Sequence, residues 1–238
     1  MITQTKGQIY LASQRGCSQL PWFRSFHTFN FGLYKEQNRE PFGNLQVCND
    51  DTLAGGKSFK MQLEVNTEVI LIPVVGAIEY KNSWGETGIL EAGQMQVFSA
   101  AAGMEYEISN PYETELVNFI QLFLTNNDNS FIPKIQEINI DLGNRNQLFP
   151  LFSQAKNGVS IHQETYGYIG KYTGRSEDLY QLKNSENGIF VFIIEGAFEV
   201  QNRLMEARDG LSLRNLDELQ FEALSNDAII LILEISGM

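Results

Sequence analysis

Two segments of this sequence repeat one pattern of apolar and polar residues. Residues 69–80 read VILIPVVGAIEY, and residues 189–200 read IFVFIIEGAFEV. The shared letters are Gly76-Ala77 with Glu79 in the first copy and Gly196-Ala197 with Glu199 in the second. Each copy is followed by a turn and then by a short strand-like run, which ends at Ala100 or at Ala223. Because the order of strands is also repeated, the sequence predicts two similar β units in tandem.

The rest of the chain is typical of antiparallel β structure. Short apolar or alternating runs are separated by Gly, Asn and Asp, and helical periodicity is scarce. Residues 59–65, for example, alternate between apolar and polar side chains with a period of two. In both units an apolar strand ends in Gly-Ala-x-Glu, where the glycine allows the backbone to curl. This arrangement predicts an all-β protein with two tandem cupin barrels of the jelly-roll type.

The composition argues against several classes of function. The 238 residues include 29 acidic and 17 basic side chains, a net charge of −12, whereas a protein that binds nucleic acid or an anionic membrane needs a basic face. Only two histidines and two cysteines are present, which argues against a His-rich metal site, a zinc ribbon and a disulfide scaffold. The sequence shows no signal segment, and its apolar runs are too short to span a membrane. We therefore expect a cytoplasmic protein in which Cys17 and Cys48 are reduced thiols.

Several motifs resemble those of the pirin family, bicupins that include bacterial quercetinase-like proteins. Residues 25–31, SFHTFNF, resemble the opening Y-H-T-F-S-F stretch of the family, and residues 42–51 resemble its F-G-x-L-R-V-x-N-x-D segment. Residues 68–110 follow its M-E-I, E-G-A-L-x-H-x-D-S-x-G, G-D-V-Q and T-G-x-x-H-S-E-x-N motifs in order. The second half is similar to the C-terminal cupin of the bacterial members. The resemblance extends from about residue 15 to the end and implies two cupin barrels.

The resemblance also implies a metal site in the N-terminal barrel, and this chain departs from it at every ligand. The usual ligands of the family are two histidines in H-P-H, one histidine in the later H-S-E, and the glutamate of that motif. The ligand positions fall on four residues of this chain: Gln62, Glu64, Tyr106 and Ile108. Imidazole is what binds iron, nickel or copper tightly, and a neutral amide is a poor ligand. We therefore expect no metal and no other cofactor.

Two interpretations of these positions stay open. In the first, Gln62, Glu64 and Tyr106 hydrogen-bond one another inside a metal-free barrel, because a buried glutamate needs partners. In the second, their oxygen atoms hold a hard cation, and a divergent metal site supports dioxygenase activity.

Both histidines lie away from these positions. His27 stands in an aromatic stretch, where we expect a structural, hydrogen-bonded residue. His162 begins the second unit, and His162 and Tyr166 are candidates for a small-molecule pocket in the second barrel. Four tyrosines near the entry of that unit favour strand packing, with the lining of a barrel mouth as the alternative: Tyr166, Tyr168, Tyr172 and Tyr180.

The expected domain organisation is an N-terminal cupin over residues 1–130, a linker over residues 131–157 and a C-terminal cupin over residues 158–238. The N-terminal segment is expected to lie across the C-terminal barrel. Residues 147–152 are interpreted as a docking segment for the linker, and strands are expected to resume at residue 159.

The missing imidazoles favour a non-catalytic pirin-like bicupin that binds a small molecule in a barrel cavity or a protein partner. The alternative is an enzyme similar to quercetin 2,3-dioxygenase, which only the family resemblance supports, and a fold does not determine a function. Nucleic acid and membranes are not expected partners.

Overall fold

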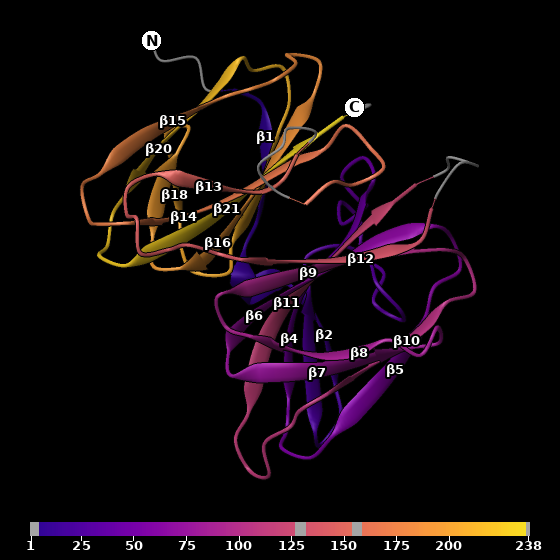
Figure 1. The fold of residues 1–238 in the computed structure, drawn as a ribbon. Coiled ribbons are helices and arrows are strands. Elements are labelled where there is room, and N and C mark those ends of the chain that lie inside the picture. Colours follow the sequence, from indigo (N-terminus) through magenta and orange to yellow (C-terminus); the bar gives the residue numbers. More distant parts are fainter. Residues whose placement is uncertain (1–4, 127–131, 154–158, 237–238) are drawn as a thin grey trace. The chain divides into compact units, whose positions relative to one another are not determined.

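The computed structural model describes residues 5–126, 132–153 and 159–236, and almost all of its regular structure is β-strand (Figure 1). Within these residues the only helix is a single 3-10 turn, η1, at Ala12–Gln14. None of the described residues belongs to a helix that is long and apolar enough to cross a membrane. The chain forms two compact units, the N-terminal unit Gly16–Ile140 and the C-terminal unit, which combines Met1–Arg15 with Asp141–Met238.

The N-terminal unit consists of a seven-stranded and a four-stranded antiparallel sheet. The large sheet has the order β12-β9-β6-β11-β4-β3-β2, with β2 at Gly16–Gln19, β3 at Phe23–His27, β4 at Leu45–Leu53, β6 at Thr67–Val75, β9 at Gln94–Ala100, β11 at Val117–Thr125 and β12 at Lys134–Asn139. The small sheet has the order β5-β10-β7-β8, with β5 at Ser58–Gln62, β7 at Ala77–Asn82, β8 at Thr87–Glu91 and β10 at Glu105–Ser109. Side chains of both sheets form one apolar core, in which Leu71 and Phe98 come from the large sheet and Ile78 and Ile108 from the small one.

The C-terminal unit has the same two-sheet architecture. Its six-stranded sheet has the order β1-β19-β16-β21-β14-β13, with β1 at Gly7–Tyr10, β13 at Leu148–Phe152, β14 at Tyr166–Tyr172, β16 at Gly188–Glu195, β19 at Gly210–Leu213 and β21 at Ala228–Ile235. Its four-stranded sheet has the order β15-β20-β17-β18, with β15 at Glu177–Gln181, β17 at Phe198–Val200, β18 at Arg203–Met205 and β20 at Glu218–Ala223. The two sheets share an apolar core that includes Val191 of β16 and Phe198 of β17. The expected all-β fold with two jelly-roll barrels is confirmed.

The repeated Gly-Ala sequence lies at the same place in both units, where the chain passes from one sheet to the other. At Gly76 the chain leaves β6 of the large sheet and enters β7 of the small one, and at Gly196 it passes in the same way from β16 to β17. The φ angle is +78° at Gly76 and +75° at Gly196, a region that residues with a side chain rarely adopt. A Cβ atom at Gly76 would also lie 2.9 Å from Cγ1 of Val117. The internal repeat therefore encodes the bend that connects the two sheets of each unit.

The bounds of the two units differ from the expected ones because distant strands pair. Residues 7–10 form β1, which pairs with β19 and appears in Figure 1 as an indigo strand among the orange and yellow strands. The expected N-terminal crossing segment is therefore an edge strand of the C-terminal sheet. Residues 134–139, expected in the linker, form β12 and pair with β9 of the N-terminal sheet.

Residues 147–152 are likewise not a docking segment of a linker. Residues 148–152 form β13, which pairs with β14. Val159 makes only an isolated bridge to Phe152, so the next strand begins at Tyr166 and not at residue 159. Residue 131 and residues 154–157 of the expected linker lie outside the described residues.

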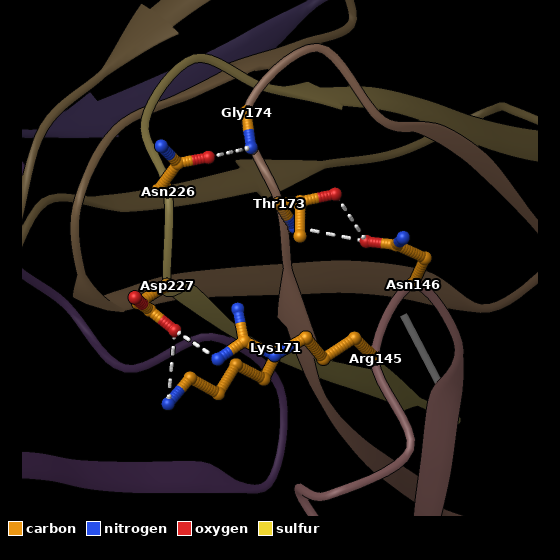
Figure 2. Close-up of polar contacts among 7 residues, drawn as sticks. All are labelled: Arg145, Asn146, Lys171, Thr173, Gly174, Asn226 and Asp227. Carbon is orange, nitrogen blue, oxygen red and sulfur yellow. Dashed lines mark hydrogen bonds and ion pairs between the residues drawn. The ribbon is translucent and has the colours of Figure 1, made fainter.

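Polar side chains fasten the segment before β13 to the C-terminal unit. Asp227 forms ion pairs with Arg145 at 2.6 Å and with Lys171 at 3.2 Å (Figure 2). Oδ1 of Asn146 accepts hydrogen bonds from the backbone N–H of Thr173 at 2.8 Å and from its hydroxyl at 3.1 Å. The hydrogen bond with Lys171, together with the charge of Arg145, holds the pKa of Asp227 below its usual value.

Candidate functional site

The four positions that the family resemblance points to lie on or beside β5 and β10. In this antiparallel pair Tyr106 stands opposite Met61, Ile108 opposite Phe59, and Glu105 opposite Gln62. Directly opposed residues share one face of a sheet, and successive residues alternate between faces. Phe59 and Met61 of β5 therefore face the barrel core together with Tyr106 and Ile108, whereas Gln62 faces the other side.

Tyr106 and Ile108 are part of the apolar core. Tyr106 is 1% exposed and Ile108 is completely buried. The Tyr106 hydroxyl donates a hydrogen bond to Sδ of Met61 at 3.2 Å, and the Tyr106 ring lies 6.0 Å from the ring of Phe98. Burial, with a smaller contribution from the charge of Asp51, raises the pKa of Tyr106 well above its usual value. At physiological pH this side chain is a neutral phenol that fills the barrel.

Gln62 and Glu64 are exposed. Gln62 is the last residue of β5, and Glu64 lies in the bend that follows, while Leu63 between them is buried in the barrel core. The expectation that Gln62, Glu64 and Tyr106 hydrogen-bond one another inside the barrel is therefore wrong. The alternation turns Phe59, Met61 and Leu63 toward the barrel core and the polar side chains between them outward, and it ends before Val65, which is exposed.

The inward-facing residues do not fit a transition-metal ion. Met61 offers a thioether and Tyr106 a neutral phenol, while Leu63 and Ile108 offer no donor atom. Iron and nickel sites of the family type need several imidazole ligands and a carboxylate. Across residues 5–126, 132–153 and 159–236, no group of three or more His, Cys, Asp and Glu side chains is placed to hold a metal ion.

Polar side chains instead form a row across the large sheet of the N-terminal unit. The register places five of them at one level on adjacent or next-but-one strands: His27, Asn49, Gln121, Gln96 and Glu137, with Leu71 between the two glutamines. Neighbours two residues away on the same strands belong to the apolar core, among them Val47, Phe119, Val69 and Phe98. Because the strand period is two, the row faces the barrel interior. We call these five residues the polar row.

One end of the polar row is well hydrogen-bonded. Nδ1 of His27 donates to Oδ1 of Asn49 at 2.9 Å, and Ser18 Oγ lies 2.8 Å from Nε2 of His27. His27 is completely buried and its ring lies 4.9 Å from the ring of Phe31. The structural role expected for His27 is therefore confirmed.

The other end of the row converges on Glu137. Its Oε1 accepts hydrogen bonds from Gln96 Nε2 at 2.8 Å and from the Tyr80 hydroxyl at 2.9 Å. Burial is the main cause that raises the pKa of Tyr80, and the hydrogen bond to Glu137 adds to it. The phenol therefore keeps its proton and remains the donor.

A buried carboxyl group lies beside the row. Asp51 stands two residues from Asn49 on β4, opposite Ser25 of β3 and Phe119 of β11, and is 1% exposed. Burial raises the pKa of Asp51 to about 7, against the effect of a hydrogen bond with Ser25. A shift of this size is characteristic of functional sites but also occurs in structural networks.

One candidate of the second barrel, Tyr166, lies opposite a different buried carboxyl group, that of Glu234. Tyr166 stands opposite Glu234 on β21 and is half-buried, and His162 lies half-buried in the bend before β14. Burial, with the charges of Glu164 and Glu234, raises the pKa of Tyr166. Tyr172 and Tyr180 are buried in the core, which confirms strand packing for these two tyrosines. A pocket formed by His162 and Tyr166 stays a prediction.

Glu234 itself is saturated with hydrogen bonds. Its oxygen atoms accept from the Tyr180 hydroxyl at 2.5 Å, from the backbone N–H groups of Lys183 and Asn184 at 3.0 and 3.1 Å, and from Nδ2 of Asn187 at 2.6 Å. It is completely buried. This carboxylate holds the loop after β15 in place, which is a structural role.

Sequence reasoning missed the polar row and Asp51 as functional candidates. The available signal was a polar letter at an inward position of a strand that is otherwise apolar, as at Gln121 in the run VNFIQLFL. The sequence alone does not show which of these polar residues lie side by side across the sheet. That depends on how six strands pair, namely β3, β4, β11, β6, β9 and β12. Cys17 is exposed and Cys48 is buried, and the two do not form a disulfide with each other.

Known proteins resemble this chain over both units. The family described as Pirin matches residues 10–124, and the family described as Quercetinase C-terminal cupin domain matches residues 152–235. Quercetin 2,3-dioxygenase of Escherichia coli strain K12 is 26% identical over 226 residues, which cover 94% of this chain and 97% of the relative.

Solved structures agree with the fold. The crystal structure of YhhW from Escherichia coli superposes with a TM-score of 0.89 at 20% identity, covering 98% of this chain and 99% of that one. A second structure of YhhW, described as a bacterial pirin in complex with nickel(II), gives a TM-score of 0.87 at 20% identity and covers 98% of this chain and 100% of that one.

Proposed function

This chain belongs to the pirin family, and we propose that it is a member without the metal centre, which binds a small molecule or a protein partner and catalyses no oxidation. One observation carries the proposal: two of the four ligand positions, Gln62 and Glu64, face outward, and the other two hold core side chains. In addition, the Tyr106 hydroxyl already has a partner within the barrel, the sulfur of Met61.

The chemistry of the barrel wall supports this proposal. A metal that activates a bound substrate and O₂ needs several strong ligands and open positions. The inward side chains near β5 and β10 supply one thioether and one phenol. The same barrel carries the polar row and Asp51 on its opposite sheet, which gives an apolar interior a few polar groups, as in many small-molecule sites. No cofactor is part of this proposal, and the cytoplasmic location stays an expectation.

The second candidate function is a dioxygenase similar to quercetin 2,3-dioxygenase. The observation that favours it is the Escherichia coli relative of that name, which aligns over 94% of this chain. This candidate requires a divergent metal site, for which Gln62, Glu64 and Tyr106 are the candidate ligands. Because Glu64 and Gln62 are exposed and Tyr106 is buried, they do not form one donor set.

An oxygen-uptake assay distinguishes the two functions. Tag-free protein is incubated with quercetin, first as purified and then after incubation with nickel(II), iron(II) or copper(II). We expect the protein to consume oxygen no faster than the matching control without protein, with or without added metal. The Glu64→Gln variant should give the same result. Uptake that depends on both protein and metal, and that Glu64→Gln abolishes, would replace the first candidate by the second.

A further inference from the structure

The small sheet of the C-terminal unit, β15-β20-β17-β18, carries like charges side by side on its outer face (Figure 1). Glu177 stands directly opposite Glu222, Glu222 opposite Glu199, and Glu199 opposite Leu204. The residues that alternate with them on β20, β17 and β18 belong to the apolar core of the unit: Phe221, Ala223, Phe198, Val200 and Met205. Because the strand period is two, the four side chains face outward, and we call them the outer row.

A surface groove of about 580 Å³ lies over the outer row. The three glutamates of the row line it, together with amide side chains and with Leu179, which is 47% exposed. Leu204, at the β18 end of the row, is 63% exposed. The groove therefore combines carboxylates with exposed apolar side chains, and both can contact a partner.

The corresponding row of the N-terminal unit has a different composition. Its register aligns Ser58, Ser109, Glu79 and Ile89 on β5, β10, β7 and β8. Glu79 and Glu199 are matching residues of the internal repeat, and both rows end in an exposed aliphatic side chain. The N-terminal unit thus has serines where the C-terminal unit has two further glutamates. The fold itself does not require three carboxylates at this level.

Internal ion pairs offset little of the charge of the outer row. Nη1 of Arg175 lies 3.2 Å from Oε1 of Glu222, but the Arg175 side chain is 82% exposed, and exposed ion pairs contribute little. Within the part of the chain that the structure describes, neither Glu177 nor Glu199 forms an ion pair. Like charges that stand directly opposite each other destabilise a sheet. A cationic partner would relieve this repulsion and would be attracted to the face by its charge.

The dimensions of the outer row indicate the shape of the partner. Its four side chains stand on adjacent strands about 4.8 Å apart, so the row is about 14 Å long. In an extended segment the side chains of one face repeat at about 6.7 Å, so three of them span about 13 Å. Two basic side chains followed by an apolar one, in the pattern Lys-x-Lys-x-Leu, therefore match the glutamates and Leu204.

We propose that the outer face of the sheet β15-β20-β17-β18 is a docking surface for an extended, lysine-containing segment of a partner protein. The ammonium groups pair with the three glutamates of the outer row, and the apolar side chain packs on Leu204. The inference rests on the proposed function, because it gives the chemistry of the protein partner. It uses residues of the C-terminal unit only, and none of the positions at which the family binds its metal.

Fluorescence anisotropy with the labelled peptide Lys-Ser-Lys-Ser-Leu-Ser, at low ionic strength, tests the surface. The peptide Lys-Lys-Ser-Ser-Leu-Ser has the same composition but places its lysines on opposite faces, and Glu-Ser-Glu-Ser-Leu-Ser has the opposite charge. We expect saturable binding of the first peptide, binding about threefold or more weaker for the second, and none for the third. Equal affinity of the two lysine peptides, or no saturable binding of the first, would overturn the proposal.

Competition with spermidine identifies the class of partner. Spermidine carries the amines without an apolar side chain for Leu204, so we expect it to displace the peptide only at a higher concentration than the unlabelled peptide requires. Displacement at the same concentration would assign the surface to a small polyamine and would overturn the assignment to a protein segment.

A double variant tests the residues of the row. Glu177→Ser with Glu222→Ser gives the row the composition of its N-terminal counterpart, so we expect peptide affinity to fall about fivefold or more. The midpoint of thermal unfolding should stay unchanged or rise, because facing like charges are removed. The matched control, Glu40→Ser with Glu186→Ser, removes two exposed carboxylates elsewhere and should bind like the parent. An equal loss in both double variants would show that net charge alone attracts the peptide, and would contradict the assignment.

Arg175→Gln should have the opposite effect. It frees Glu222 from its internal partner, so peptide binding should become tighter, by up to about fivefold. Unchanged or weaker binding would contradict the role of Glu222.

Metal analysis of the same protein sample separates the two claims. Failure of peptide binding by metal-free protein would overturn this inference alone. A stoichiometric transition metal in the sample would overturn the proposed function on which it rests.

Discussion

The Tyr106 hydroxyl donates to the sulfur of Met61 across the β5–β10 pair, at 3.2 Å. Tyr106 occupies a position where the family resemblance implies a histidine ligand, and its partner is a thioether from the facing strand. At these positions the side chains of β5 and β10 therefore pack against each other inside the barrel. In the same register Gln62 stands opposite Glu105, on the outward face of the pair.

Removal of the Tyr106 hydroxyl should have a small effect on stability. Sulfur is a weak acceptor, so Tyr106→Phe should lower the free energy of unfolding by about 1 kcal/mol or less. Urea unfolding followed by circular dichroism measures the difference. A loss of several kcal/mol would mean that the hydroxyl has a stronger partner than Met61.

The register of β5 predicts which substitutions would create a metal site. One set of variants places ligands at the inward positions: Met61→His, Leu63→His, Tyr106→His and Ile108→Glu. The other set uses the positions that the family motif suggests: Gln62→His, Glu64→His, Tyr106→His and Ile108→Glu. Nickel titration by calorimetry, on variants with the parental circular dichroism, should show one ion bound by the first set and none by the second. The reverse result would mean that β5 is shifted by one residue.

Stability should depend on pH through Asp51. Burial raises the pKa of Asp51 from 3.8 to about 7 in the folded chain. Between these values the folded state holds a proton that the unfolded state releases, so the stability falls as the pH rises, by at most about 1.4 kcal/mol per pH unit. Below this window and above it the contribution of Asp51 no longer changes with pH.

Asp51→Asn should remove this dependence. Urea unfolding at pH 5 and pH 8 should show a larger drop for the parent than for Asp51→Asn, while the exposed Asp217→Asn should behave like the parent. An identical pH profile for the parent and Asp51→Asn would show that Asp51 is ionised in both the folded and the unfolded chain over this range.

Glu234 should be among the most sensitive positions of the C-terminal unit. Glu234→Gln places an amide N–H₂ group among donors that need acceptors, so the free energy of unfolding should fall by about 2–4 kcal/mol. Tyr180→Phe removes one of these donors and should cost less. Chemical denaturation of both variants gives the comparison. Equal stability of Glu234→Gln and the parent would indicate that the loop after β15 does not depend on this carboxylate.

Much of the fold follows from local sequence patterns. The repeated Gly-Ala letters predict two similar units, and the structure shows why, since Gly76 and Gly196 turn the chain from one sheet to the other. The strand pairings that set the bounds of the units could not be predicted in the same way. β1 pairs with β19, which lies about 200 residues later in the chain, and the sequence of neither strand indicates which strand it pairs with.

The prediction of the candidate site from the sequence failed for a different reason. The alternation of residues 59–65 already indicated that Met61 and Leu63 share the inward face, whereas the family motif assigned the ligand positions to Gln62 and Glu64. Local periodicity was the better guide because the inward face of a strand is set by burial. Gln121 could not be recognised as a member of the polar row from its strand alone, since the other members lie on other strands, as Asn49 does on β4.

Elemental analysis by inductively coupled plasma mass spectrometry tests the central claim most directly. The protein is expressed without a histidine tag in medium supplemented with iron, nickel and copper, and is purified without chelators. We predict far less than one transition-metal ion per chain, because the inward positions of β5 and β10 offer only Met61 and Tyr106 as donors. About one iron, nickel or copper ion per chain would contradict the account.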